Sequence, residues 1–177
     1  MKKIILSVIS VVAAAVLLCG CSRGNGLPGV KTEDAPKAAS VKQSDYNNDL
    51  EGLEKYLNAL GYIPDDCKPV EMTLCSVIGA KDGDRYNFNV DNSAVFVELY
   101  EYDTDNLNDD AKRVIGEVQK EGKYYVFGES SKEDAASFEA SISINGKYMV
   151  SYTLTSNGET NEQRKKDFIS AVEGFYR

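Results

Sequence analysis

The sequence predicts an α+β fold: a mainly antiparallel sheet of about five strands packed with helices, in the order ααββαβββα. Two observations predict this class. Segments whose apolar residues recur every three or four positions, as on a helix face, alternate with short segments rich in valine, tyrosine and phenylalanine, as in strands. An Asn-Gly dipeptide between two of the strand-like segments indicates a hairpin, and therefore antiparallel pairing.

Two helices are predicted at the start of the domain. The first covers residues 46–60, where apolar side chains form one stripe: Tyr46, Leu50, Leu53, Leu57 and Leu60. Ser44 or Asp45 can cap its start, and Gly61 stands where a left-handed residue commonly ends a helix. A second helix is expected over residues 69–79, although its β-branched residues would also suit a strand.

The strongest strand signal is AVFVELYEYD, residues 94–103, which is dense in β-branched and aromatic residues. Its apolar side chains alternate onto both faces: Val95, Val97 and Leu99 on one, and Phe96, Tyr100 and Tyr102 on the other. A strand of this kind is usually central, with at least one helix over it. The alternating segment RYNFNV, residues 85–90, predicts a neighbouring strand.

Two more helices are predicted further along. One is predicted within the segment of residues 106–122, and the helix itself begins at Asn108 or Asp109. The other lies at the end of the chain, where Thr160 and Gln163 match a capping box. Its expected apolar face consists of Phe168, Ala171, Val172, Phe175 and Tyr176.

Between these helices the sequence predicts the strand KYYVFG, residues 123–128, and a hairpin over residues 137–154. Asn145 and Gly146 predict a type I′ turn, which needs positive φ at both positions. In that register the expected buried side holds Phe138, Ile142, Ile144 and Met149. The other side holds Tyr148, Val150 and Tyr152.

The N-terminus is predicted to be a targeting signal. Two lysines precede an apolar run from Ile4 to Leu18, which is shorter than the ~20 residues of a membrane-spanning helix. The motif Leu18-Cys19-Gly20-Cys21 resembles the lipobox of bacterial lipoproteins. The resemblance implies cleavage before Cys21, acyl chains such as palmitate attached through it, and a position on the extracytoplasmic face of the cell membrane. An uncleaved anchor helix and an ordinary signal peptide are the alternatives.

The chain is expected to have three parts: a lipoprotein signal peptide at 1–20, the lipidated cysteine and a flexible tether at 21–44, and one globular domain at 45–177. The tether is rich in glycine, serine, alanine, lysine and proline and shows no apolar periodicity. With 20 basic and 28 acidic residues the net charge is −8, so the protein repels phosphate backbones and no nucleic-acid partner is expected.

A further, loose resemblance covers residues 70–153. The segment IGAKDGDRYNFN, followed by VELYEYD and an acidic helix start, resembles small uncharacterised lipoproteins of Gram-positive, gut-type bacteria. No activity comes with this resemblance, so it assigns no functional residue.

Several catalytic chemistries are excluded or disfavoured by composition. The chain has no histidine, which excludes Ser-His-Asp and Cys-His catalysis and histidine-ligated zinc. The acidic run at residues 103–110 lacks the glycine and distal glutamate of an EF-hand loop, so it is expected to begin a helix rather than bind calcium. Glu98 and Glu101 point to opposite faces of their strand and cannot form a catalytic carboxylate pair. No cofactor and no metal are expected.

Cys67 and Cys75 are the two thiols of the predicted domain. If the second helix forms, eight residues separate them by ~12 Å along the axis, beyond the ~7 Å that a disulfide allows between Cα atoms. The expectation is therefore no bond between them, but the sequence alone does not decide whether they are free.

Tyrosine is the remaining candidate for function, because it combines apolar area with a hydrogen-bonding tip. Tyr100, Tyr102, Tyr148 and Tyr152 are the candidate binding surface, although tyrosine also simply suits half-buried strands. The predicted function is a lipid-anchored, non-catalytic extracytoplasmic domain that binds a protein, peptide or cell-wall ligand. A histidine-free hydrolase using carboxylates and a structural accessory of an envelope complex are the alternatives. A pocket with converging carboxylates would favour the hydrolase.

Overall fold

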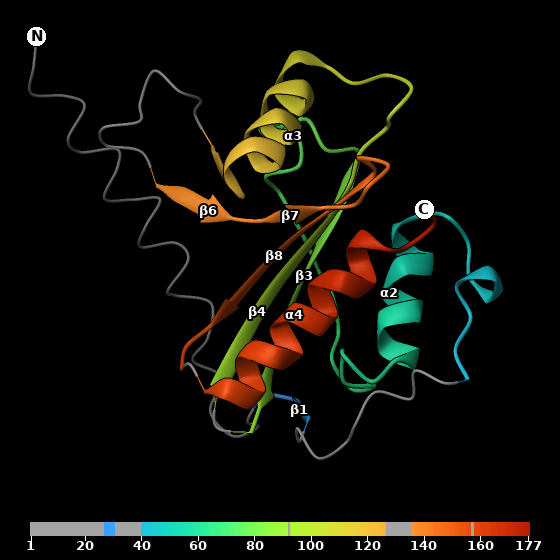
Figure 1. The fold of residues 1–177 in the computed structure, drawn as a ribbon, viewed down its shortest axis with the longest axis vertical. Helices are drawn as coiled ribbons and strands as arrows, with labels where there is room; N and C mark the ends of the chain where they lie inside the picture. The colour runs from blue at the N-terminus through green and yellow to red at the C-terminus, as the bar shows by residue number, and fades with distance from the viewer. Residues whose placement is uncertain (1–26, 31–39, 92, 127–135, 157) are drawn as a thin grey trace, which may run out of the picture.

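The computed structural model describes residues 27–30, 40–91, 93–126, 136–156 and 158–177, and its centre is a sheet in the order β1-β3-β4-β8-β7, with β2 also paired to β3. The strands span Gly29–Val30 (β1), Val70–Glu71 (β2), Asp82–Val90 (β3), Ser93–Glu101 (β4), Ser141–Ile142 (β7) and Tyr148–Leu154 (β8). All neighbours are antiparallel except β1 and β3. The predicted α+β class with a mainly antiparallel sheet is therefore confirmed (Figure 1).

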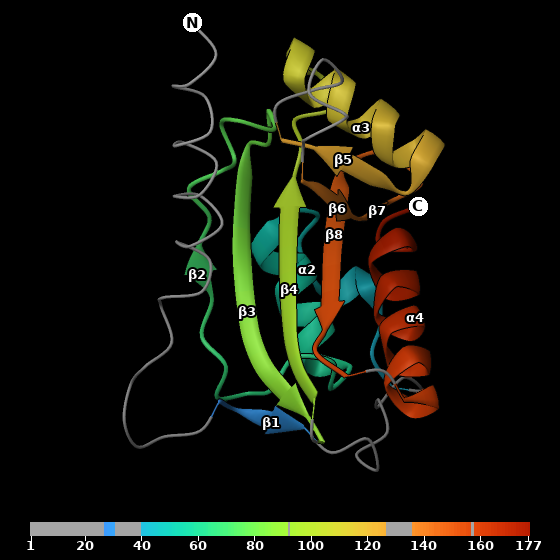
Figure 2. The same ribbon diagram turned by 90° about the vertical axis from the view of Figure 1, so that its left-hand side faces the viewer.

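The α-helices of the described residues pack on both faces of this sheet: Leu50–Ala59 (α2), Asp109–Glu121 (α3) and Glu159–Glu173 (α4). Helices α2 and α4 cover one face, and α3 covers one end of the other face (Figure 2). A separate two-stranded ladder of Lys123–Tyr125 (β5) and Ser137–Glu139 (β6) packs beside α3. A 3-10 turn, Gln43–Asp45 (η1), precedes α2.

Strand β4 is central, as predicted, because β3 pairs along one edge and β8 along the other. Val95, Val97 and Leu99 are fully buried beneath α2 and α4. On the opposite face Tyr100 is fully buried under α3, whereas Phe96 is 40% exposed. The difference arises because α3 covers only one end of that face (Figure 2).

The first helix forms, but it begins later than predicted. Asp49 is its N-cap, and its carboxylate accepts a hydrogen bond from the Gly52 amide at 2.8 Å. Ser44 and Asp45 lie in η1 instead. Gly61 has the expected positive φ, +79°. The third predicted helix is confirmed as α3, capped by Asn108.

The second predicted helix is wrong. Residues 70–71 form β2, and the chain then turns repeatedly through residues 73–79. The reason is that the outer edge of β3 offers backbone partners: Val70 pairs with Arg85, and the Met72 amide donates to the Gly83 carbonyl at 2.9 Å. These interstrand bonds replace helix bonds at residues 70–72, and β-branched Val70 suits a strand. Residues 73–79 form turns with local bonds, such as that from the Val77 amide to the Leu74 carbonyl at 2.9 Å.

The predicted hairpin forms only at its centre. Ser141 and Ile142 pair with β8, but the chain before them leaves the sheet, because β6 pairs with β5. Phe138 therefore stacks on the Tyr124 ring and stays 38% exposed. The strand predicted at residues 123–128 forms as β5 at its first three residues. Residues 127 and 128 of the prediction lie outside the described part of the chain.

The type I′ turn is also wrong, because only Gly146 of its two central residues has a positive φ, +72°. The Asn145 side-chain oxygen accepts from the Ser143 hydroxyl at 2.7 Å and from the Lys147 amide at 3.0 Å, which holds a longer loop. As a result Ile144, expected in the core, is 66% exposed.

The terminal helix is α4, and its apolar face packs as predicted, with Phe168, Val172 and Phe175 fully buried. The predicted capping box is wrong: Gly158 is the N-cap and has no side-chain cap. The Gln163 amide instead donates to the Asp167 carboxylate at 2.8 Å, one turn further along.

Candidate functional site

A polar pocket of about 430 Å³ lies at the end of β4, where segments far apart in the sequence meet. We call it the lysine–glutamate pocket; its lining is Asn48, Lys81, Glu101, Tyr102, Asp103, Thr104, Asp105, Asn145 and Lys147. These residues come from the segment before α2, the segment before β3, the end of β4 with its following loop, and the β7–β8 loop. Its volume falls in the range of small-ligand sites.

Glu101 is the buried centre of this pocket, with a side chain only 5% exposed. Its Oε2 accepts a hydrogen bond from the Leu50 amide at 2.8 Å, which places the carboxylate at the N-terminus of α2. Its Oε1 lies 3.0 Å from the Lys81 ammonium and 3.5 Å from the Lys147 ammonium. One carboxylate is therefore shared between a helix start and two cations.

The two lysines reach Glu101 because backbone hydrogen bonds fix the segments that carry them. The Lys81 amide donates to the Glu101 carbonyl, and the Tyr102 amide donates to the Lys147 carbonyl, both at 2.8 Å. The Lys147 ammonium also donates to the Asn48 carbonyl. The Lys81 side chain is 57% exposed, so its ammonium keeps donors for a ligand.

The rim of the pocket is acidic, with Asp103 and Asp105, and both carboxylate oxygens of Asp103 are engaged. Asp103 accepts hydrogen bonds from the Asn106 amide group at 3.0 Å and from the Asp105 backbone at 3.2 Å. The bond from Asn106 is the main reason that the pKa of Asp103 is lowered. Asp109 and Asp110 lie in the first turn of α3, as expected of a helix start. No cluster of acidic or cysteine side chains suited to a metal occurs among the described residues.

The four predicted tyrosines require a correction, because all are buried in the core: Tyr100, Tyr102 and Tyr148 are 0% exposed and Tyr152 is 3% exposed. Tyr100 and Tyr102 pack under α3, while Tyr148 and Tyr152 pack under α2 and α4 on the opposite face. They therefore form no common exposed surface. Sequence could not distinguish the two cases, since tyrosine suits both.

The two glutamates of β4 point to opposite faces, as predicted, and both are paired. Glu98 forms an ion pair with Arg85, its cross-strand neighbour on β3. The Tyr100 hydroxyl also donates to Glu98 at 3.0 Å. Neither Glu98 nor Glu101 is placed as half of a catalytic pair.

A different pair of carboxyls does meet between α2 and β3. Burial, together with the charge of the neighbouring Asp84, raises the pKa of Glu54 to about 8. One Glu54 oxygen is buried without a hydrogen-bond partner in the described structure. Sequence reasoning missed this pair, because nothing local links a helix residue to a strand residue thirty positions later.

The two thiols are free, and they lie on opposite sides of the sheet. Cys67 packs with the α2 and α4 core and donates to the Asn87 carbonyl at 3.4 Å. Cys75 packs on the α3 side and donates to the Met72 carbonyl at 3.2 Å. The expected absence of a bond is confirmed, but the sheet between the thiols is the reason, and not a helix. Burial raises the pKa of both.

Cys21 and the lipobox-like motif lie outside the described residues. In the part of the chain that is described, no helix has both the length and the apolar character needed to cross a membrane.

Comparison of the chain with models of protein families, with curated proteins and with solved structures finds no match. The site must therefore be interpreted from its own geometry. Lys81 and Lys147 are the residues that sequence reasoning missed; each lies next to a glycine-containing turn, and only the fold brings them together.

Proposed function

We propose that this chain is a lipid-anchored, extracytoplasmic binding domain without catalytic activity, and that the lysine–glutamate pocket receives its ligand. The observation that carries the proposal is the convergence of Lys81 and Lys147 on the single buried carboxylate of Glu101. Two ammonium groups share one carboxylate at the pocket floor, a local excess of one positive charge, while Asp103 and Asp105 on the rim bring the charge of the whole lining to −1. A ligand that carries both a carboxylate and an ammonium group matches this arrangement.

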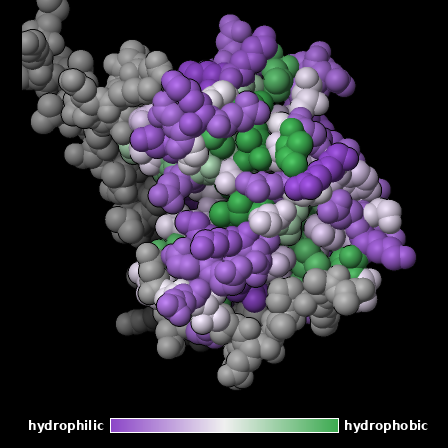
Figure 3. Space-filling model, in the orientation of Figure 1, coloured by the Kyte–Doolittle hydropathy of each residue, from purple (hydrophilic) through white to green (hydrophobic). Residues whose placement is uncertain are grey.

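The chemistry of the lining favours a short peptide with a free carboxylate, such as a peptide of the cell wall. Its carboxylate would face the lysine ammonium groups, because lysine binds carboxylates as a point charge. The Asn48 side-chain oxygen accepts from the Tyr148 hydroxyl at 2.7 Å, and its amide nitrogen can donate to a peptide carbonyl. Asp105 on the rim suits an ammonium group. The α4 side of the molecule shows hydrophobic side chains only as separate patches among hydrophilic ones, which offers less to an apolar partner (Figure 3).

A calorimetric titration with a cell-wall stem peptide tests this proposal. We expect the peptide with a free C-terminal carboxylate to bind, and the same peptide with an amidated terminus to bind far more weakly. Lys147→Ala and Lys81→Ala should each weaken binding roughly tenfold or more, because a charge-assisted hydrogen bond contributes about 1.5–3 kcal/mol. Lys112→Ala, an exposed lysine on α3, is the control. Equal affinity in all four proteins would contradict the proposal.

The anchor is tested separately through Cys21. In a bacterial host, the wild-type chain should incorporate labelled palmitate and sediment with membranes, and Cys21→Ser should do neither. Membrane association that survives this substitution would support an uncleaved anchor helix instead.

The carboxyl pair of Glu54 and Asp84 is the one observation that favours the hydrolase. A carboxyl with a raised pKa beside a second carboxyl, as Glu54 lies beside Asp84, is typical of the acid in such enzymes. If the stem peptide is cut during the titration, and Glu54→Gln abolishes the cutting, the hydrolase replaces the binding domain.

A further inference from the structure

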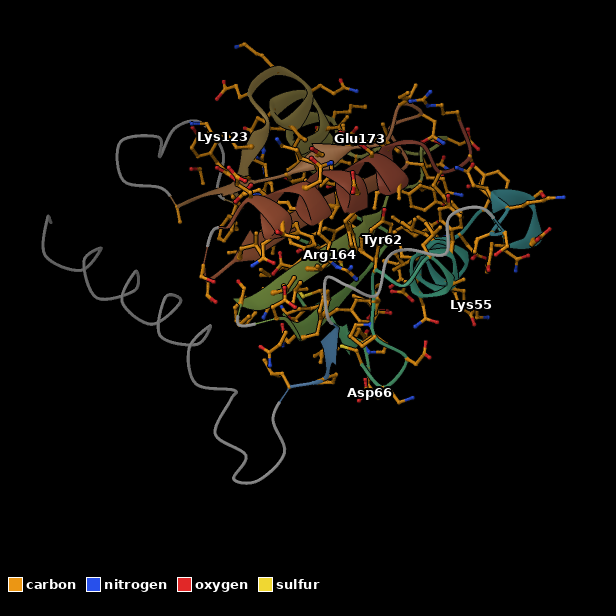
Figure 4. The ribbon with its side chains drawn as sticks, turned by 60° about the horizontal axis from the view of Figure 1, so that its bottom comes forward. Lys55, Tyr62, Asp66, Lys123, Arg164 and Glu173 are labelled. Carbon is orange, nitrogen blue, oxygen red and sulfur yellow. The ribbon has the colours of Figure 1, made fainter. Side chains whose placement is uncertain are left out.

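Arg164 is a buried cation in the first half of α4. The residue is only 6% exposed, and its Nη2 donates to the carbonyl of Gly61, in the segment that follows α2. The guanidinium carbon lies 5.6 Å from the centre of the Tyr62 ring, a cation–π distance. Figure 4 shows the two side chains next to each other between α4 and this segment.

The charge of Arg164 has no carboxylate at ion-pair distance in the described part of the chain. Among the described residues the arginine ion pairs are those of Arg85 and Arg113, and none involves Arg164. Its Nε is buried and has no hydrogen-bond partner there. Because a guanidinium carries five donors and is always charged, burying it unpaired is strongly unfavourable unless an anion joins it.

Most polar neighbours of Arg164 are neutral, but Asp167 is acidic, and its charge acts on Tyr62 together with that of Arg164. Asn161 lies three positions earlier on the same face of α4, and its side-chain oxygen is also buried without a partner. Burial raises the pKa of Tyr152 to about 12, and the charge of Arg164 opposes the rise. The Tyr152 and Tyr62 rings both pack against the Phe168 ring, with centroids 5.1 Å and 5.6 Å from it. Asp167, the next acidic residue on α4, accepts a hydrogen bond from Gln163.

We infer that Arg164, together with Asn161, Tyr62 and Tyr152, forms a binding site for a small oxyanion, either a carboxylate or a phosphate. The site lies between α4 and the segment after α2, and it shares no residue with the lysine–glutamate pocket. The guanidinium supplies the charge and a planar fork of donors, which matches the geometry of both anions. Asn161 and the tyrosine hydroxyl groups supply neutral hydrogen bonds around it.

The test is thermal unfolding of the full chain in detergent, at constant ionic strength, with chloride replaced by phosphate or by acetate. We expect at least one of the two oxyanions to raise the unfolding midpoint saturably in the wild type. Arg164→Met should abolish this response. Lys166→Met removes an exposed positive charge from the same helix and should retain it. The anion that acts identifies the ligand class: phosphate alone, acetate alone, or both.

A second readout separates a binding site from a structural role. In chloride alone, Arg164→Met should be at least as stable as the wild type, because it removes an unpaired buried charge. If Arg164 serves only to hold Gly61 and Tyr62, the variant loses stability and the wild type shows no oxyanion response, which would overturn the inference.

A milder variant covers the case in which Arg164→Met does not fold. Arg164→Lys keeps the charge but loses the fork, so the dissociation constant for the active anion should rise roughly tenfold. In the wild type, the NMR signal of the Arg164 Nε–H should shift on titration with that anion. An unchanged signal would also overturn the inference.

Discussion

The backbone amide of Leu50 donates a hydrogen bond to Oε2 of Glu101, with 2.8 Å between the two atoms. This bond fastens the start of α2 to the end of the central strand, and it does so at the floor of the lysine–glutamate pocket. The same carboxylate therefore stabilises the fold and positions Lys81 and Lys147.

Replacing Glu101 should lower the stability of the fold. Glu101→Gln keeps an acceptor for Leu50 but leaves two lysines uncompensated, and we expect it to lower the free energy of unfolding by about 1–3 kcal/mol. Glu101→Ala removes the acceptor as well and should cost about 3–5 kcal/mol. Urea denaturation measures both. Glu51→Gln, which breaks an exposed pair with Lys55, is the control and should show no measurable change. A Glu101 variant as stable as this control would contradict the proposed role.

Stability should depend on pH through Glu54. The folded-state pKa of Glu54 is raised from its ordinary value of 4.5 to about 8, by burial first and then by Asp84, with a smaller effect of Asp82. Between these two values the folded state holds a proton that the unfolded state has lost. The contribution of Glu54 to the free energy of unfolding is therefore fully present below pH 4.5, and it is lost as the pH rises towards 8.

Glu54→Gln removes this dependence. Relative to wild type, the variant should gain stability between pH 5 and pH 8, on the order of 1 kcal/mol, because solvent screens a group that is only partly buried. Urea midpoints at the two pH values measure the gain, with Glu51→Gln as the control. Wild type and Glu54→Gln curves that run parallel would show that Glu54 titrates normally.

The register of β8 makes a sharp prediction about proline. The Tyr102 amide bonds to the Lys147 carbonyl and the Thr155 amide to the Ala94 carbonyl, so odd-numbered residues of β8 bond to β4. The Thr153 amide is then a ladder donor, whereas the Leu154 amide faces the outer edge. No described strand pairs with that edge beyond Val150.

Thr153→Pro should therefore cost roughly 2–3 kcal/mol more than Thr153→Ala, since it removes a sheet hydrogen bond. Leu154→Pro should be close in stability to Leu154→Ala, because the outer edge of a strand tolerates proline. Thermal or urea unfolding of the four variants checks the order. The reverse order would mean that the register of β8 is shifted by one residue.

Two glycines should respond in opposite directions to alanine. Gly79 has φ +70°, and a Cβ there would lie 2.4 Å from the Ala111 nitrogen and from the Asn108 side-chain oxygen that caps α3. Gly79→Ala should therefore destabilise by several kcal/mol. Gly116, inside α3, has no atom within 4 Å of an added Cβ, so Gly116→Ala should stabilise by about 0.5–1 kcal/mol. Calorimetric melting separates the two; a stable Gly79→Ala variant would contradict the packing against α3.

The parts of the fold that sequence predicts are those with a local signal. The apolar residues on both faces of β4 lie within ten consecutive positions, and their pattern identifies a central strand. The stripes of α2, α3 and α4 are local in the same way. The segment at residues 70–79 has a helical stripe too, but residues 70–72 bond to β3 and residues 73–79 form turns. The long-range partner of the first three residues overrides the local pattern there.

The candidate site could not be predicted, because its parts meet only in three dimensions. Lys81 and Lys147 belong to turns, and turn lysines are ordinarily solvated. Glu101 sits in a strand that sequence identified, but its partners come from α2 and from two loops. The prediction that the tyrosines form a binding surface depends on residue type alone, and residue type does not distinguish a core position from a binding surface.

The most direct test of the central claim is an NMR titration of the isotope-labelled chain with the cell-wall stem peptide. We predict that amide shifts concentrate on residues 81, 101–105 and 145–147, and that Lys147→Ala removes them while the peptide stays intact. Shifts that cluster instead around Glu54 and Asp84, or cleavage of the peptide, would contradict the claim that this protein is a binding domain whose site is the lysine–glutamate pocket.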